Sequence, residues 1–312
     1  MVQKDSLKPL IIVCGPTASG KTALAVRIAK YLDTSVISAD SIAIYKGLKI
    51  GTAKPTEAEM QGVKHYLIDF IDADKDFTVA EYTSLAKSLI DRLHSEGKIP
   101  IVCGGTGYYI DSILYDLSYG NCKKDDELRK KYARIAEDKG ARRLYEMLEA
   151  VDPESSAVLH ENDVMRVSRA LEIFELTGKR KSEIVDKKTP NYNYIAFSFD
   201  FERERLYKRI DERVDKMIAD GLIEEVESLI IGGLDKNCQS MQAIGYKEVV
   251  EGLSSGCPRE TIAETIKRNT RRYAKRQITY FKRLENRVML DPDDTDIEKQ
   301  IIRHLKNGRF VD

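Results

Sequence analysis

The sequence predicts an α/β fold in which helices flank a parallel sheet, with an all-helical insertion and a helical C-terminal region. Short apolar runs alternate with helix-like stretches over residues 1–120, and this alternation is typical of βαβ units. From 121 to 190 the apolar runs give way to charge-dense helical patterns. A chain of 312 residues exceeds the usual single-domain size, so we predict a core built from 1–120 and 191–312 around an inserted domain at 121–190.

The first 120 residues contain the elements expected to form the sheet. Strands are predicted at 10–14, 35–39, 66–69 and 99–103, and helices at 21–32 and 78–94. Thr78 and Glu81 have the spacing of a capping box, which marks the beginning of the second helix. Near-continuous apolar strands are typical of a parallel sheet, whose ligands bind beyond the carboxyl ends of the strands. Gly15, Asp40 and Gly104 follow three of these ends, so we expect the functional site there.

The remainder of the chain is predicted to be mostly helical. One strand is expected at 194–199, and helices are expected at 202–219, 222–231, 243–251 and 259–284. The insertion shows no convincing strand pattern, and no internal repeat or low-complexity tract is present in the sequence.

Composition and charge exclude several classes of protein. Lys+Arg and Asp+Glu both total 51, so the net charge of zero says nothing about an anionic partner until its distribution is considered. The five cysteines form no C-x-x-C pair, which predicts a reducing, cytoplasmic environment. The sequence has no signal-peptide core and no apolar run of roughly 18 residues, so we expect neither secretion nor membrane insertion. We also expect a monomer.

A phosphate-binding loop is the strongest motif. Its residues match G-x-x-x-x-G-K-[ST] between a predicted strand and a predicted helix, and they are Gly15, Pro16, Thr17, Ala18, Ser19, Gly20, Lys21 and Thr22. Backbone N–H groups and the helix N-terminus of such a loop hold phosphate oxygens, Lys21 adds a charge, and Thr22 is expected to ligate Mg²⁺. The motif predicts a P-loop NTPase-like sheet that binds a di- or triphosphate, ATP included, without specifying the compound.

Two further candidates lie at the same edge of the predicted sheet. Asp40, followed by Ser41, could act as a general base, as a Mg²⁺ ligand or as a helix cap, since Asp is a preferred cap residue. Thr106 lies in a Gly-Gly-Thr-Gly run, which fits a tight turn as well as it fits a site.

The segment 267–283 carries a strong positive charge. It holds no acidic residue and eight basic ones, namely Lys267, Arg268, Arg271, Arg272, Lys275, Arg276, Lys282 and Arg283. A solvated basic face is the simpler explanation, but the lack of compensating carboxylates favours a polyanion such as nucleic acid. Tyr273, Gln277 and Tyr280 interleave with the charges and could stack on bases or hydrogen bond to them.

The insertion contains a second basic pair, Arg166 and Arg169. These arginines could bind phosphate or pair with Glu172 or Glu175, and the residues alone favour the salt bridge. The four histidines show no metal-ligand spacing, so we interpret them as structural or surface residues.

Taken together, these motifs resemble the tRNA dimethylallyltransferase family in its compact bacterial form, over about residues 9–290. The blocks that carry the resemblance lie in order at 15–22, 40–41, 44–47, 50–55, 65–69, 104–107, 162–169, 240–247 and 273–279. The Ile-Gly-Thr-Ala-Lys-Pro block at 50–55 and the Ala-Lys-Arg-Gln-x-Thr block at 274–279 are the most specific.

The resemblance implies transfer of a dimethylallyl group from dimethylallyl diphosphate to the N6 amine of the adenosine immediately 3′ of the anticodon, position 37. Mg²⁺ would assist the reaction, and diphosphate would be released. The substrates would be tRNAs that read codons beginning with U. Asp40, Thr106 and Lys21 would be catalytic, and residues 15–22 would bind the donor diphosphate. The residues implied to contact the tRNA anticodon stem-loop are Asp40, Ser41, Ile42, Ala43, Thr106, Arg129, Met165, Arg166, Val167, Ser168, Arg169, Gln242, Ala243, Ile244, Gly245, Tyr246, Lys247, Lys275, Arg276, Gln277, Ile278, Thr279, Tyr280, Phe281 and Lys282.

Three positions depart from the commoner family pattern. Ala43 stands where many relatives carry Gln, Met165 where Gln or Arg is frequent, and Tyr280 where Trp is usual. Three other functions remain open from the P-loop alone: a nucleoside or metabolite kinase, a prenyltransferase acting on free adenine nucleotides, and a non-catalytic RNA-binding ATPase module.

Overall fold

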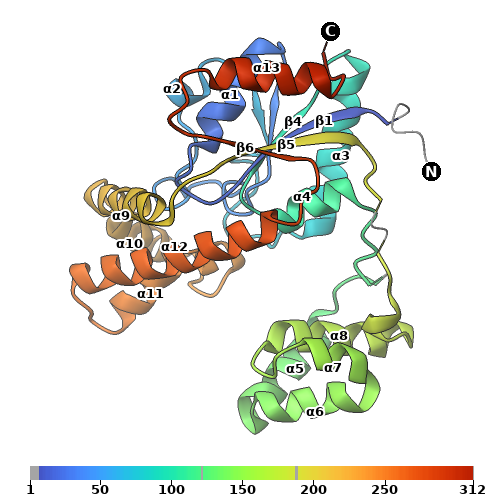
Figure 1. Ribbon diagram of the computed structural model, residues 1–312. Coiled ribbons are helices and arrows are strands. Elements are labelled where there is room, and N and C mark those ends of the chain that lie inside the picture. The colour runs from blue at the N-terminus through green and yellow to red at the C-terminus, as the bar shows by residue number, and fades with distance from the viewer. Residues whose placement is uncertain (1–6, 121, 187–188, 312) are drawn as a thin grey trace. The chain divides into compact units, whose positions relative to one another are not determined.

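The computed structural model describes residues 7–120, 122–186 and 189–311, which form two compact units. The first unit comprises Met1–Leu114 and Pro190–Asp312, and the second comprises Tyr115–Thr189 (Figure 1). The second unit thus begins at Tyr115 where the sequence predicts 121, and Asn121 itself lies outside the described residues.

A six-stranded parallel sheet forms the centre of the first unit, which confirms the predicted α/β class. The strands are β1 (Pro9–Cys14), β2 (Val36–Ser38), β3 (His65–Tyr66), β4 (Ile101–Gly104), β5 (Asn193–Phe199) and β6 (Arg287–Leu290), in the order β3-β2-β4-β1-β5-β6. The central strand β1 pairs with β4 and β5, with Ile11 opposite both Ile101 and Ile195. The carboxyl ends of β1, β2 and β4 therefore meet at one edge of the sheet.

Helices cover the sheet because each one buries an apolar stripe. The first unit begins with α1 (Lys21–Tyr31), α2 (Glu57–Met60), α3 (Val79–Ser95) and α4 (Gly107–Leu114), and ends with α13 (Ile297–Asn307). Leu24 and Ile28 of α1 share a core with Ile301 and Leu305 of α13. The capping box at the beginning of α3 is present, since Thr78 N donates to the Glu81 carboxylate at 2.8 Å and Glu81 N donates to Thr78 Oγ1 at 3.2 Å.

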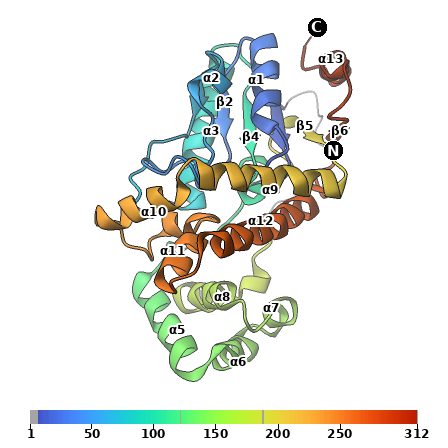
Figure 2. The ribbon, with the colours of Figure 1, turned by 90° about the vertical axis from the view of Figure 1, so that its left-hand side faces the viewer.

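Four helices follow β5 in the first unit. They are α9 (Arg203–Ala219), α10 (Leu222–Ile231), α11 (Tyr246–Ser254) and α12 (Arg259–Phe281), with a 3₁₀ turn at Gln239–Gln242. The long helices α9 and α12 lie side by side (Figure 1, Figure 2). Leu206 and Ile210 of α9 and Ala274 of α12 pack with Ala18 of the P-loop, so both helices touch the end of β1.

The described residues of the second unit form helices joined by turns and contain no strand. It contains α5 (Asp126–Lys139), α6 (Ala141–Val151), α7 (Pro153–Val158) and α8 (Val164–Thr177), followed by a 3₁₀ turn at Lys181–Glu183. Tyr132, Leu144, Leu148, Val167 and Leu171 form its core.

Several predicted bounds differ from the structure for local reasons. The strand predicted at 66–69 is limited to His65–Tyr66, because Leu67 and Asp69 adopt positive φ angles of 60° and 57°. The helix predicted at 243–251 begins at Tyr246, after Gly245 with φ 97°. The elements α2, α4, β6 and α13 were not predicted. Among the described residues, no helix is long and apolar enough to cross a membrane.

Candidate active site

The P-loop adopts the conformation expected between β1 and α1. Gly15, Ala18 and Gly20 have φ angles of 138°, 61° and 86°, which turn the backbone around the helix N-terminus. The hydroxyl of Ser19 is buried and has no hydrogen-bond partner among the described residues. A buried hydroxyl without a partner is costly, so this group fits a ligand oxygen. Lys21 Nζ donates to Pro16 O at 2.6 Å, and burial lowers the pKa of Lys21.

Asp40 lies just beyond β2 and closes a turn with half of its carboxylate. Its Oδ1 accepts hydrogen bonds from Ile42 N at 2.9 Å and Ala43 N at 3.1 Å. Its Oδ2 accepts no hydrogen bond from the described residues and is open to a ligand. Asp40 therefore caps the turn through Oδ1, and its Oδ2 can still act as a general base or bind a ligand.

Thr106 joins the ends of β2 and β4. Its N–H donates to Ala39 O at 3.0 Å, and its Oγ1 accepts from Ser41 N at 3.0 Å. Gly104 permits this approach, since a Cβ there would lie 2.1 Å from Ala39 O. The Gly-Gly-Thr-Gly run is thus a tight turn that also holds the Thr106 hydroxyl beside the turn of Asp40.

A cleft of about 750 Å³ brings most of the P-loop and Asp40 together, and Thr106 lies behind Gly104 and Gly105, outside its lining. The predicted residues that line it are Thr17, Ala18, Ser19, Gly20, Lys21, Thr22, Asp40, Ala43 and Gln277. Tyr273 of α12 also lines the cleft. Burial raises the pKa of Tyr273 to about 12. The P-loop, the Asp40 turn and α12 therefore share one cavity.

Two arginines of α9, missed by the sequence reasoning, complete the wall of the cleft. Arg209 donates from Nε to Ala18 O at 2.8 Å. Arg213 pairs with no carboxylate among the described residues, and burial lowers its pKa although the charge of Asp40 raises it. The two side chains lie one helical turn apart, a spacing that is visible in the sequence but common in surface helices. An unpaired, half-buried guanidinium beside a P-loop fits a phosphate group.

The Ile-Gly-Thr-Ala-Lys-Pro block forms another wall of the cleft. Ile50 N donates to the carboxylate of Glu225 at 3.0 Å, and Tyr246 donates its hydroxyl to the same carboxylate at 2.6 Å. Lys54 donates to Asp69 Oδ1 at 2.6 Å. The contacts through Glu225 hold the block against α10 and α11, and Lys54 ties it to the segment after β3.

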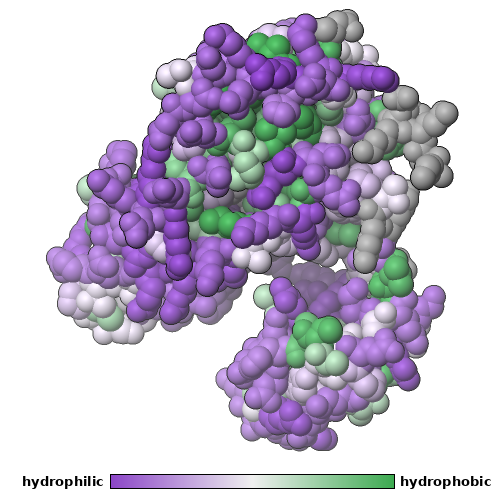
Figure 3. Space-filling view, viewed as in Figure 1, coloured by the Kyte–Doolittle hydropathy of each residue, from purple (hydrophilic) through white to green (hydrophobic). Residues whose placement is uncertain are grey.

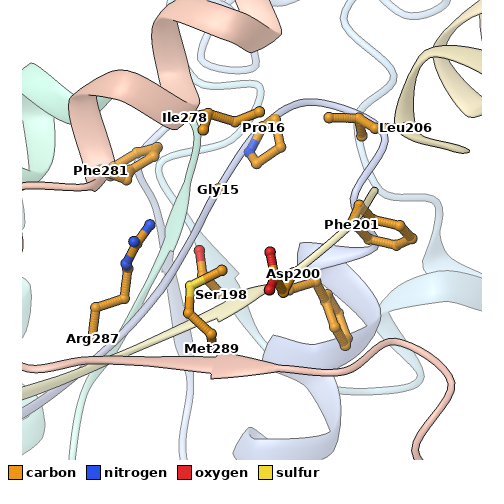
Figure 4. Close-up of a pocket in the computed structure, with 11 residues that line it drawn as sticks. Gly15, Pro16, Ser198, Asp200, Phe201, Leu206, Ile278, Phe281, Arg287 and Met289 are labelled. Atoms are coloured by element: carbon orange, nitrogen blue, oxygen red, sulfur yellow. The ribbon is translucent and has the colours of Figure 1, made fainter. Parts of the chain in front are cut away.

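A second, smaller pocket of about 60 Å³ lies where Gly15 and Pro16 of the P-loop face β5 and β6 (Figure 4). Arg287 points into it beside Ser198, and Phe281 and Ile278 of α12 line another side (Figure 4). This volume is too small for an allylic diphosphate, so the larger cleft is the candidate site.

The basic segment of α12 divides into paired and unpaired cations. Lys267 pairs with Asp215 at 2.7 Å, Arg271 pairs with Asp211, and Arg283 pairs with Asp111. The exposed cations without a carboxylate partner among the described residues are Arg268, Arg272, Lys275, Arg276 and Lys282. The surface over α9 to α12 is mostly hydrophilic (Figure 3). The polyanion hypothesis thus rests on these five cations.

Other α12 residues predicted to contact tRNA have different environments. Tyr280 donates its hydroxyl to Asp111 Oδ2 at 2.6 Å, and Phe281 is buried. Ile278 is half-buried, whereas Thr279 is exposed. The side chain of Phe281 therefore packs inside the unit.

The block at 240–247 also contains both exposed and buried residues. Gln242 and Lys247 are exposed, Ile244 is half-buried, and Ala243, Gly245 and Tyr246 are buried. Only the exposed side chains are available to a macromolecule in this conformation.

Some of the predicted RNA contacts in the helical unit are buried or paired with a carboxylate, and others are exposed. Arg129 and Arg169 both bind the buried carboxylate of Glu172, and Arg169 also donates to Tyr119 O at 2.6 Å. Their hydrogen bonds outweigh burial and lower the pKa of Glu172. Val167 and Ser168 are buried as well. By contrast, 82% of Met165 is exposed, and Arg166 is exposed beside Asp163.

No group of three or more His, Cys, Asp or Glu side chains among the described residues is arranged to hold a metal ion. Thr22 and Asp40 do line the same cleft. Mg²⁺ is commonly bound by one or two protein oxygens together with phosphate oxygens of the substrate, so this donor set fits a substrate-borne ion.

Known proteins are similar to this chain over nearly its whole length. The model of the IPP transferase family matches residues 43–284. A tRNA dimethylallyltransferase of Acetivibrio thermocellus is 45% identical over 300 residues, which are 95% of this chain and 96% of the relative.

Two solved structures also match. One is a tRNA isopentenylpyrophosphate transferase from Bacillus halodurans, with a TM-score of 0.73 and 39% identity over 97% of this chain and 98% of that chain. The other is a eukaryotic dimethylallyltransferase acting on tRNA, with a TM-score of 0.79 and 28% identity over 97% of this chain and 79% of that chain. With the family model and a close relative covering most of its length, the chain belongs to the IPP transferase family.

Proposed function

We propose that this enzyme transfers a dimethylallyl group from dimethylallyl diphosphate to the N6 amine of adenosine 37 in tRNAs that read codons beginning with U. The observation that carries the proposal is the single cleft that joins the P-loop to Asp40, beside the Thr106 turn. The names of the relatives support a tRNA substrate and a prenyl transfer.

The donor half of the reaction uses the P-loop. Backbone N–H groups of Ala18 to Thr22, the ammonium of Lys21 and the guanidinium of Arg213 would hold the diphosphate, and the unpartnered hydroxyl of Ser19 fits one of its oxygens. Thr22 would hold Mg²⁺ with the phosphate oxygens, and the ion would neutralise charge on the leaving diphosphate. These cations stabilise negative charge that grows as the allylic C–O bond breaks.

The acceptor half uses Asp40. An adenine amine is a poor nucleophile because its lone pair is delocalised, so a base that takes its proton assists the attack. Oδ2 of Asp40 is open for this role, while Oδ1 keeps the turn in place. A new N–C bond forms, the C–O bond to diphosphate breaks, and the amine proton passes to Oδ2. The hydroxyl of Thr106 would orient the amine.

The exposed cations of α12 would bind the tRNA backbone. Arg272, Lys275, Arg276 and Lys282 are the main candidates, because phosphate contacts by Lys and Arg dominate nucleic-acid affinity. In the helical unit, Met165 and Arg166 remain candidate contacts by their exposure. The target base must be swung out of its stack to reach the cleft, at a cost of a few kcal/mol that the backbone contacts offset.

We expect a monomer to suffice, since all the proposed groups belong to one chain. A tRNA substrate and reduced cysteines agree with an activity in the cytoplasm.

A donor and acceptor assay tests the proposal. The purified protein should transfer labelled dimethylallyl groups to an unmodified tRNA with adenosine at position 37, and a tRNA with guanosine there should accept none. Transfer to free AMP alone would favour an adenylate prenyltransferase. Phosphate transfer or release from ATP without prenyl transfer would favour a kinase or an ATPase module.

A further inference from the structure

Gln277 links the two halves of the cleft through its side-chain amide. Its Oε1 accepts a hydrogen bond from Thr17 N at 2.9 Å, and its Nε2 donates to Gly105 O at 3.0 Å. The side chain is buried, with 5% exposed. One residue of α12 is thereby bonded to the P-loop and to the turn that carries Thr106.

The packing around this amide is tight. A Cβ on Gly105 would lie 2.3 Å from Nε2 of Gln277, so the turn has a glycine where the amide approaches. Tyr273, one turn earlier on α12, lines the same cleft, and the side chains of Thr106 and Gln277 oppose the rise in its pKa that burial causes. Such a packed and hydrogen-bonded network leaves the two loops little freedom to move apart.

These contacts change the role expected of Gln277. Its carbonyl oxygen and an N–H of its amide are already used inside the protein, and the side chain does not reach the exposed face of α12. The N–H of Thr17 is also committed to Gln277, so it is turned away from the phosphate cradle. A contact between Gln277 and RNA is therefore a poorer explanation than an internal one.

We propose that Gln277 is a positioning residue that fixes the distance between the donor loop and the acceptor turn. The proposal rests on the proposed prenyl transfer. In that reaction, the allylic carbon carried by the P-loop must meet an amine held beside Asp40 and Thr106. Because reacting atoms must approach to about 3–3.5 Å, an ångström of drift between the two loops costs roughly 100-fold in rate.

Gln277→Met removes both hydrogen bonds at nearly constant volume and is the first test. We expect kcat to fall about 100-fold, while the Kd for tRNA stays within about twofold of wild type. The Kd for inorganic diphosphate should rise about fivefold, because the P-loop loses an anchor. Gln300→Met on α13, whose amide bonds to Asp294, is the matched control and should leave all three quantities unchanged.

Gln277→Glu gives a readout that a merely structural role would not move. The deprotonated acid can accept from Thr17 N but repels Gly105 O, whereas the protonated acid can make both hydrogen bonds. Burial raises the pKa of a carboxylic acid, so the ratio of variant kcat to wild-type kcat should rise several-fold between about pH 8 and pH 6. A flat ratio would overturn the proposal, and this test stands alone should Gln277→Met not fold.

Two other outcomes would contradict the positioning role of Gln277. Wild-type kcat in Gln277→Met, or a loss confined to tRNA affinity, would show that Gln277 does not position the loops. If the wild-type protein transfers no prenyl group, the proposed function fails. The affinity for inorganic diphosphate would then still test whether Gln277 holds the P-loop in place. Equal affinity in wild type and Gln277→Met would show that it does not.

Discussion

Asp40 accepts a hydrogen bond from the backbone N–H of Ala43 through Oδ1, at 3.1 Å. The same oxygen accepts from Ile42 N, so one half of the carboxylate builds the turn after β2. Asp40 lines the cleft that holds the P-loop, and its other oxygen accepts no hydrogen bond from the described residues. The two oxygens thus have separable roles, and substitutions can separate a structural loss from a chemical one.

Asp40→Asn should lower kcat by at least about 100-fold, which is the usual contribution of a general base. The asparagine carbonyl can still accept from Ile42 N and Ala43 N, so the melting temperature and the Kd for tRNA should stay close to wild type. Asp40→Ala loses the turn as well and should be less stable by about 1 kcal/mol. Steady-state kinetics and thermal melts check both variants, and a wild-type kcat in Asp40→Asn would reduce Asp40 to a cap.

Arg213→Gln should raise the KM for dimethylallyl diphosphate by roughly 10-fold or more, because a hydrogen bond to a charged group contributes about 1.5–3 kcal/mol. The guanidinium has no carboxylate partner among the described residues, so its removal strands no buried acid. Lys208→Gln, at an exposed position on the same helix and outside the lining of the cleft, is the control. An unchanged KM for the donor would exclude Arg213 from the diphosphate site.

The sequence predictions that the structure confirms rest on patterns among residues that are close together in the chain. The P-loop at 15–22 and the capping box of Thr78 and Glu81 depend on residues within one or two turns of each other, so their spacing is visible in the chain. The parallel sheet follows from the alternation of apolar runs and helices.

Contacts between distant segments could not be predicted in this way. Gln277 meets Thr17 across 260 positions, and nothing in the pattern of α12 distinguishes its buried amide from an exposed one. The strand β6 has half-buried residues at one sheet edge, and α13 is amphipathic only in relation to the core that it covers. The salt bridge of Arg129 to Glu172 also depends on how α5 and α8 pack, whereas that of Arg169 to Glu172 joins positions three apart on α8 and was predicted from the sequence.

Replacing both Arg272 and Arg276 with Ala should weaken tRNA binding and flatten its salt dependence. Each lost phosphate contact reduces the slope of log K against log salt by roughly 0.7–0.9. Lys267→Ala is a matched control on the same helix, because Lys267 pairs with Asp215 and Glu264 and should make no phosphate contact. Binding isotherms at several salt concentrations measure the slopes, and an unchanged slope in the double variant would assign α12 a solvated basic face.

Asp152 should make the helical unit sensitive to acid. Burial works to raise its pKa, but hydrogen bonds from Ser155 and Ser182 outweigh it and lower the pKa to about 2. A carboxyl group with a folded-state pKa below its unfolded value near 3.8 stabilises the fold above pH 4, and this contribution is lost as the pH falls toward 2. The contribution at neutral pH is about 2 kcal/mol.

Asp152→Asn places an amide N–H against Ser182 N or, in the other orientation of the amide, against Ser155 N, so it should remove most of that stability at pH 7. Hydrogen exchange of α6 and α7 measures the loss in the unit directly. The difference from wild type should shrink between about pH 4 and pH 2.5, because Asp152 of the unfolded wild-type chain takes up its proton in this range while Asp152 of the folded chain stays largely ionised. Glu154→Gln, at an exposed position in the first turn of α7, is the control and should change stability by less than about 0.5 kcal/mol. A difference between Asp152→Asn and wild type that stays constant with pH would mean that packing, and not ionisation of Asp152, holds the turn to Ser182.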